Sequence, residues 1–129
     1  MPGTDVVTVF VTAPGKEAAL ALVRQVVEES LCACGNVIPN VTPVFRWDGK
    51  VKVEEEVLLI LKTSSAKGPA LIARVAELHT YEVPEVLSLR VEDGFGPYLD
   101  WVGECTSEKA PSAPSEKAPS APSVESLDG

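Results

Sequence analysis

Cysteine, histidine and basic residues are all scarce in this 129-residue sequence. Three cysteines are too few, and odd in number, for a disulfide framework, so we expect free thiols and a reducing, cytoplasmic location. One histidine excludes a zinc site of two cysteines and two histidines, and any multi-histidine site within one chain. Lysine and arginine number 11 against 19 aspartates and glutamates, a formal net charge of −8 that opposes binding to nucleic acid and to anionic membrane surfaces.

Long apolar runs and nucleotide-binding motifs are also missing. No apolar stretch approaches the roughly 20 residues of a membrane-spanning helix, and no basic segment followed by an apolar one marks the N-terminus. We therefore expect no membrane partner and no secretory signal. Neither a G-x-x-x-x-G-K-[ST] loop nor a G-x-G-x-x-G turn occurs. No nucleophile is patterned with a base beyond the single His79, so we expect no enzymatic activity.

The end of the sequence is repetitive. The octapeptide Ser-Glu-Lys-Ala-Pro-Ser-Ala-Pro occurs twice without change, over residues 107–114 and 115–122. Residues 107–129 hold four of the 11 prolines and no aromatic residue, a composition that cannot bury enough apolar surface to fold. The sequence therefore predicts one folded domain over residues 1–106 and a disordered tail over residues 107–129. A proline-rich docking ligand is the alternative interpretation of the tail.

In the first 106 residues, β-branched runs alternate with stretches of helical spacing. They predict seven elements, which are a strand near residues 5–12, a helix near 16–31, strands near 36–47 and 50–63, a helix near 69–79, a strand near 85–91 and a helix near 97–105. Gly35 is expected to end the first helix. Asp48-Gly49 favours a tight hairpin turn, and the 14-residue strand after it is too long for a small domain, so the outer half of this hairpin should project as an arm. Pro39 and Pro43 predict a bent, bulged or edge strand before the turn.

This order of elements predicts an α+β fold of the ferredoxin-like β-α-β-β-α-β type. Such a fold has an antiparallel sheet with helices on one face, here followed by a short C-terminal helix. The other sheet face carries apolar residues and has no cover in a monomer, which is typical of an interface. The bare face and the arm together predict an oligomer, in which Trp47 beside the hairpin turn packs against a neighbour.

Several short motifs resemble one family. They are Val11-Thr12-Ala13-Pro14, Cys34, Ile38-Pro39, Arg46-Trp47-Asp48-Gly49-Lys50, Glu54-x-Glu56-Val57, Leu61-Lys62-Thr63, His79-x-Tyr81-Glu82-Val83-Pro84-Glu85 and Tyr98-Leu99-Asp100-Trp101. In this order they resemble the CutA divalent-cation tolerance family over about residues 6–102. The resemblance implies a ferredoxin-like protomer in a homotrimer, with the long hairpins pairing across subunits. It also implies an association with copper and other divalent cations, and brings no established enzymatic reaction.

Two positions depart from the members of that family that are proposed to bind copper. Those members carry a cysteine in the first strand and two adjacent histidines, where this sequence has Val11 and Leu78-His79. One imidazole without a nearby thiolate is a poor copper site. The candidate metal ligands are therefore His79 and Glu82, with Glu85 or groups from another subunit as further ligands. The alternative for His79 is a structural hydrogen bond at the end of a helix.

The candidate small-ligand site is a groove between subunits near His79, with Lys62, Tyr81 and Glu85 as binding residues. Lys62 could bind an anion there or pair with a carboxylate. Three functions remain open: a trimeric CutA-like binding protein, a small-molecule sensing module without metal chemistry, and a ferredoxin-like hydrolase of the acylphosphatase kind. The hydrolase needs an arginine after the first strand, where Ala13-Pro14-Gly15 supplies none.

Two remaining clusters are interpreted as structural. Cys32-Ala33-Cys34 has the look of a metal motif but lacks two ligands, so we expect buried or oxidation-prone thiols. Glu54 and Glu56 share one face of a strand with Lys52, and cross-strand or intersubunit pairing is the expected role.

Overall fold

The computed structural model describes residues 3–107. Its elements are β1 (Val6–Ala13), α1 (Lys16–Glu28), β2 (Cys34–Val41), β3 (Val44–Trp47), β4 (Lys50–Val53), β5 (Glu56–Ser64), α2 (Gly68–Leu78), β6 (Val86–Arg90) and α3 (Gly96–Cys105). The tail expected over residues 107–129 lies, beyond Ser107, outside the described residues.

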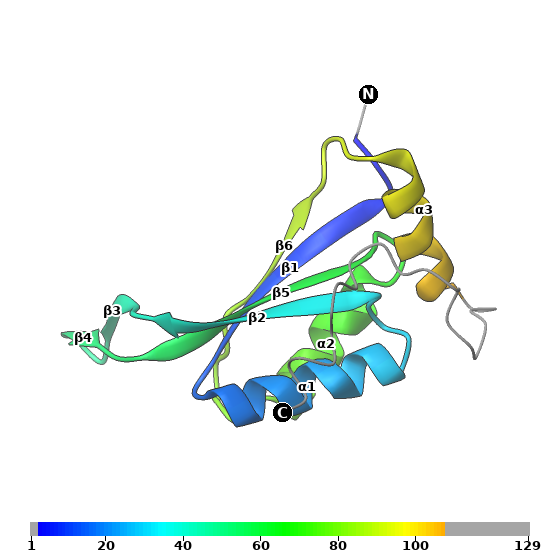
Figure 1. Ribbon diagram of the computed structural model, residues 1–129. Helices are drawn as coiled ribbons and strands as arrows, with labels where there is room; N and C mark the ends of the chain where they lie inside the picture. Colours follow the sequence, from blue (N-terminus) through cyan, green and yellow to red (C-terminus); the bar gives the residue numbers. More distant parts are fainter. Residues whose placement is uncertain (1–2, 108–129) are drawn as a thin grey trace.

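One four-stranded antiparallel sheet organises the body. Its order is β2-β5-β1-β6, so β5 lies between the two strands that α1 connects, and β1 lies between the two that α2 connects. Figure 1 shows α1 and α2 on the same side of this sheet and α3 at the end far from the hairpin arm. The mixed α+β class expected from the sequence is confirmed.

The core lies between the sheet and the first two helices. Along β5 every second side chain is buried, namely Val57, Leu59, Leu61 and Thr63. Leu71 and Val75 of α2 and Val26 of α1 meet this row and are fully buried. The strict alternation follows from the pleat, which turns successive side chains to opposite faces.

The opposite face of the sheet is apolar and largely open. Its side chains follow from the strand register, because Phe10 lies opposite Ile60 in β5 and Leu87 in β6. Leu87 and Leu89 are 54% and 47% exposed. Helix α3 covers only one end of this face, where Val102 packs with Val6 and Ala33.

The end of α1 differs from the expectation. The helix stops at Glu28, and Ser30, not Gly35, adopts a left-handed conformation with φ of 60°. The amides of Ser30 and Leu31 donate to carbonyls of the last turn over 3.0 Å, which closes the helix in a Schellman arrangement. Gly35 lies inside β2, where a Cβ atom would come within 2.6 Å of Leu61 and 2.9 Å of Val23, so packing requires glycine there.

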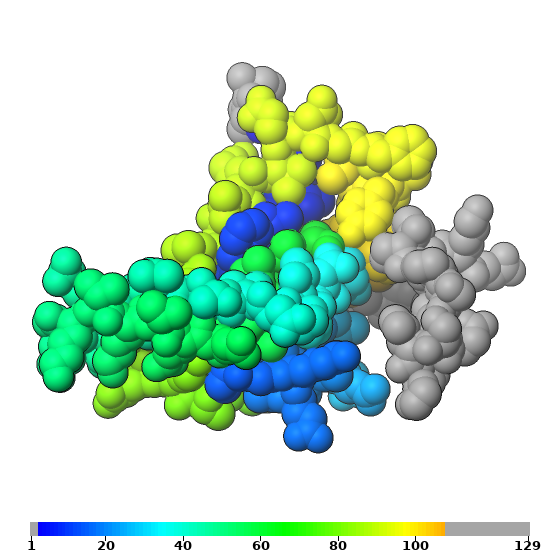
Figure 2. Space-filling model, turned by 60° about the vertical axis from the view of Figure 1, so that its left-hand side comes forward, coloured from blue at the N-terminus to red at the C-terminus, as the bar shows by residue number. Residues whose placement is uncertain are grey.

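The long strand expected over residues 50–63 is two strands. β4 ends at Val53 and β5 begins at Glu56, and β3 and β4 form a separate two-stranded sheet. The pairing of β2 with β5 shifts register between Ile38 and Val41, in the proline-interrupted edge strand, as the prolines predicted. The Asp48-Gly49 turn forms with φ of 57° and 77°, and Figures 1 and 2 show the resulting arm projecting from the body. The arm is therefore a two-stranded sheet of its own and not a continuation of the four-stranded sheet.

Candidate functional site

His79 ends α2 and ties it to the first strand. Its Nε2 atom lies 2.6 Å from the carbonyl oxygen of Thr12, and the backbone amide of Tyr81 donates to its Nδ1 atom over 3.0 Å. Because a carbonyl only accepts, Nε2 carries the proton and donates it, while Nδ1 accepts. Both ring nitrogens are thus engaged in structural hydrogen bonds.

Tyr81 joins the loop after α2 to the start of β5. Its phenol donates a 2.5 Å hydrogen bond to the Glu56 carboxylate. Burial raises the pKa of Tyr81 well above its usual range, and the hydrogen bond and the negative charges of Glu56 and Glu54 raise it further. Tyr81 therefore stays a protonated donor, and its ring lies 4.7 Å from that of His79.

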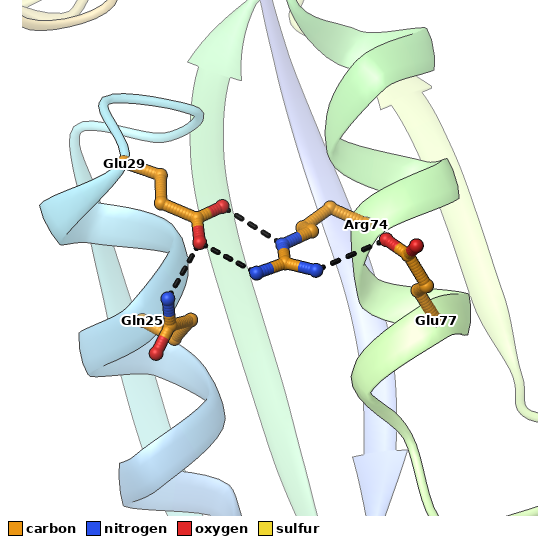
Figure 3. A network of polar contacts seen from close by, with 4 residues as sticks. All are labelled: Gln25, Glu29, Arg74 and Glu77. Carbon is orange, nitrogen blue, oxygen red and sulfur yellow. Dashed lines mark hydrogen bonds and ion pairs between the residues drawn. The ribbon is translucent and has the colours of Figure 1, made fainter.

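An interhelical ion pair holds α2 in place. Arg74 of α2 donates to both carboxylate oxygens of Glu29 after α1, over 2.9 and 2.7 Å, and to Glu77 over 3.0 Å (Figure 3). Gln25 donates to the same Glu29 carboxylate over 2.5 Å. This contact, the Arg74–Glu29 clamp, joins α2 to the end of α1.

A groove with a volume of about 510 Å³ runs between the arm and the loop after α2. The arm and the segments beside it supply Phe45, Arg46, Trp47, Lys52, Pro43, Glu54 and Glu56, and the loop supplies Tyr81, Glu82, Val83 and Glu85, with Thr12 between. The lining residues thus include four acidic, two basic and three aromatic residues. The groove is suited to a ligand with both apolar and positively charged parts.

The structure brings together three of the five expected site residues along this groove, namely Tyr81, Glu82 and Glu85. His79 contacts one of these residues, Tyr81, through a hydrogen bond from the Tyr81 amide and a contact between the two rings. Lys62 lies elsewhere in the chain. It is six residues from Glu56 along β5, about 20 Å at the rise of a strand, and it donates to the side chain of Asn36.

The sequence analysis did not place the residues of the arm in a ligand site. Phe45 pairs with Lys52 across β3 and β4, and Trp47 pairs with Lys50. The alternation about the Asp48-Gly49 turn shows that these four side chains share one face. It does not show that this face turns toward Tyr81, which depends on the break between β4 and β5.

The residues present do not fit a copper site within this single chain. Val11 is fully buried in the core, Leu78 packs against it, and both nitrogens of His79 are engaged. Among residues 3–107, no three histidine, cysteine, aspartate or glutamate side chains are grouped so as to hold a metal ion.

The two cysteines of the Cys-x-Cys sequence lie in separate environments. Cys32 is buried, and burial raises its pKa to about 12. Cys32 therefore stays a protonated thiol at neutral pH. The thiol of Cys34 contacts the Tyr98 hydroxyl at 3.3 Å. Across the described part of the chain, the helices are too short or too polar to cross a membrane.

Sequence comparisons agree with this architecture. The model of the CutA1 divalent ion tolerance protein family matches residues 7–105. Protein CutA of Mus musculus is 44% identical over 112 residues, which make up 87% of this chain and 63% of the mouse protein. The divalent-cation tolerance protein CutA of Thermus thermophilus is 42% identical over 98 residues, 76% of this chain and 95% of that protein. The chain covers less than two thirds of the mouse and human proteins.

Solved structures show the same fold. CutA from Xylella fastidiosa superposes with a TM-score of 0.79 at 33% identity, over 81% of this chain and all of that one. CutA1 from Oryza sativa gives 0.78 at 39% identity, over 82% of this chain and 97% of that one.

Fold and groove together define a small α+β domain with an open apolar sheet face, a projecting hairpin and an acidic, aromatic-walled groove at the base of that hairpin. The chain belongs to the CutA1 divalent ion tolerance family. The resemblance drawn from the sequence motifs is thereby confirmed.

Proposed function

We propose that the protein is a cytoplasmic, homotrimeric binding protein of divalent-cation tolerance and not an enzyme. The observation that carries this proposal is the placement of Tyr81, Glu82 and Glu85 along one groove beside an exposed arm, in a member of a family named for divalent-ion tolerance. The three free thiols Cys32, Cys34 and Cys105 support the location, because such thiols persist in reducing compartments.

The homotrimer is supported by two surfaces that a monomer leaves open. Leu87 and Leu89 stay exposed on the sheet face away from α1 and α2. On the arm, Val51 is 63% exposed and Trp47 50% exposed. Apolar area of this kind is usually covered by a partner, and a second and third copy would cover the sheet face and the arm together. Light scattering tests this, and a monomer mass at micromolar concentration would refute it.

Divalent cations such as copper would bind weakly, and through carboxylates. The single protomer offers no grouped ligand set in its described residues, and the Thr12 carbonyl and the Tyr81 amide compete for the His79 ring. Imidazole binds a metal only through a free, deprotonated nitrogen, so occupation would require breaking one of these bonds. Carboxylates of the groove, including Glu82 and Glu85, are the alternative ligands.

Copper titration by calorimetry tests this proposal. We expect weak binding in the wild type, further weakening in Glu82→Gln, and a marked gain in a Val11→Cys, Leu78→His double variant that restores the thiolate and second imidazole. Tight binding in the wild type that survives both His79→Ala and Glu82→Gln would contradict the proposed site.

The small-molecule sensing function is the second candidate. The groove volume of about 510 Å³ and its aromatic walls favour it, since these are features of sites for organic ligands rather than for bare ions.

A further inference from the structure

The loop between β6 and α3 contains an aspartate followed directly by a glycine, Asp93-Gly94. Residues 92–97 are all exposed, and the Phe95 side chain that follows the pair is 75% exposed. Figure 1 shows this loop at the end of the molecule where α3 lies, far from the arm. Both residues of the pair are therefore open to water.

The Asp93 side chain folds back onto the backbone of the next residue. Its Oδ1 atom accepts a hydrogen bond from the Gly94 amide over 2.9 Å. The amide nitrogen is therefore about 4.1 Å at most from Cγ, the carbon that carries this oxygen. Gly94 has no Cβ atom to hinder a closer approach. Rotation about the Asp93 side-chain bonds brings the nitrogen and Cγ to the separation of about 3–3.5 Å at which groups react.

The other described Asp-Gly pair is arranged differently. Asp48 and Gly49 form the turn of the arm with φ of 57° and 77°, and the pairing of β3 with β4 closes this turn. Of the two pairs in residues 3–107, only Asp93 accepts a hydrogen bond from the amide of its own glycine. The strand pairing holds the backbone of the turn in one conformation, whereas the loop before α3 lies outside the sheet.

We propose that Asp93 is a site of spontaneous isoaspartate formation. The Gly94 amide nitrogen attacks Cγ of the protonated side chain, so that the N–Cγ bond forms, the Cγ–OH bond breaks, and the amide proton leaves with the hydroxyl as water. Water then adds to one of the two carbonyls of the succinimide ring. Addition at Cγ restores aspartate, whereas addition at the main-chain carbonyl breaks its bond to the Gly94 nitrogen and leaves isoaspartate. The reaction consumes no oxidant or reductant.

This modification changes the backbone just before α3. Isoaspartate carries the main chain through its side chain, which adds one methylene group to the backbone. Two residues further on, the Phe95 carbonyl accepts hydrogen bonds from the amides of Tyr98 and Leu99 over 3.0 and 3.1 Å. The Leu99 side chain also lies 3.2 Å from the position that a Cβ atom of Gly94 would take. A longer backbone at residue 93 should therefore displace the first turn of α3.

Ageing of the full-length protein at neutral pH and body temperature tests the proposal. Methyl transfer from S-adenosylmethionine by an isoaspartyl methyltransferase, followed by peptide mapping, reads Asp48, Asp93 and the Asp128-Gly129 pair outside the described residues separately. In the native protein we expect isoaspartate to accumulate roughly tenfold faster at Asp93 than at Asp48. In guanidinium chloride the two rates should be similar, because the fold no longer distinguishes the two pairs.

Two results of this experiment would overturn the proposal. One is a native rate at Asp93 no higher than at Asp48, which includes the case in which a neighbouring copy covers the loop. The other is the same tenfold ratio in the unfolded chain, which would assign the difference to local sequence and not to the structure.

Substitutions at position 93 supply the matched controls. Asp93→Glu keeps the charge but would need a six-membered ring, so methyl transfer to this peptide should disappear. Asp93→Asn forms the same succinimide with loss of ammonia in place of water and should react faster, and a variant that forms no isoaspartate would exclude the ring at this position. Amide exchange of Tyr98 and Leu99 should rise several-fold in the aged wild type and stay constant in aged Asp93→Glu. Unchanged exchange in a wild-type sample rich in isoaspartate would refute the effect on α3.

Discussion

The Tyr81 phenol and the Glu56 carboxylate are joined by a 2.5 Å hydrogen bond, which links the loop after α2 to the strand that leads into the arm. Residues 25 positions apart in sequence thereby form the base of one groove. The bond sets the position of the loop relative to the arm, so the width of the groove depends on it.

Tyr81→Phe should loosen the loop and lower stability. A hydrogen bond to a charged, half-buried acceptor contributes about 1–2 kcal/mol. We expect a loss of that size in urea unfolding and faster amide exchange in residues 80–86. Tyr98→Phe is the matched control, because its hydroxyl faces only the Cys34 thiol at 3.3 Å and should cost less. Equal losses in the two variants would contradict a special role for the Tyr81 bond.

The Arg74–Glu29 clamp should make stability depend on acid pH. Hydrogen bonds from Arg74 and Gln25 lower the pKa of Glu29 from an ordinary 4.5 to about 2. A pKa that is lower in the folded state stabilises the fold above pH 4.5, and this contribution is lost as pH falls through about 2.

Urea unfolding between pH 2 and 7 measures this dependence. Arg74→Met removes the guanidinium but leaves Gln25, so the pKa of Glu29 should rise toward its ordinary value and the variant should lose less stability on acidification than the wild type. Arg24→Met, which changes the same residue type in α1, is the control and should keep the wild-type slope. Parallel curves for the wild type and Arg74→Met would show that the clamp does not set the pH dependence.

Gly35→Ala should destabilise the sheet–helix packing. The added methyl group would meet the Leu61 and Val23 side chains at 2.6 and 2.9 Å, and overpacking of this kind costs about 1–3 kcal/mol. Gly103→Ala, in α3 with no atom within 4 Å of the new methyl, should be neutral or stabilising. Thermal unfolding of both variants measures the difference. Unchanged stability of Gly35→Ala would mean that the Leu61 and Val23 side chains move to make room for the methyl group.

Trp47→Ala should weaken self-association. A half-exposed ring that anchors an interface contributes about 2 kcal/mol or more per subunit. Sedimentation across a dilution series measures the change. Leu20→Ala removes a 42% exposed apolar side chain from α1, on the helix side of the sheet, and should leave assembly unchanged. Unchanged self-association in Trp47→Ala would show that the Trp47 ring of the arm does not contribute to the interface.

Local sequence patterns predicted the elements because the signals act over a few residues. Runs of β-branched and apolar residues predicted a strand that ends near residue 63, as β5 does, and Asp48-Gly49 predicted the turn. The predictions were wrong where contacts between segments far apart in the chain decide the structure. Gly35 was predicted to end the first helix. It lies instead in β2, where the absence of a side chain leaves room for Leu61.

The groove was only partly predictable for the same reason. Tyr81, Glu82 and Glu85 were predicted as site residues from one short motif, and the structure places all three along the groove. Phe45 and Lys52 were not, since their place in the groove depends on where β4 ends and β5 begins. Lys62 was predicted to take part in a groove between subunits, and within this chain it lies six residues, about 20 Å, from Glu56 along β5.

The sequence by itself determined the order of strands and helices, the acidic charge, the turn of the arm and the family. These properties depend on composition and on periodicity within single elements. The tertiary structure decided which nitrogens of His79 remain available, which face of the arm meets the loop, and that the carboxylates are spread rather than grouped. Each of these depends on distances between segments far apart in the chain, which the packing of the sheet and helices alone fixes.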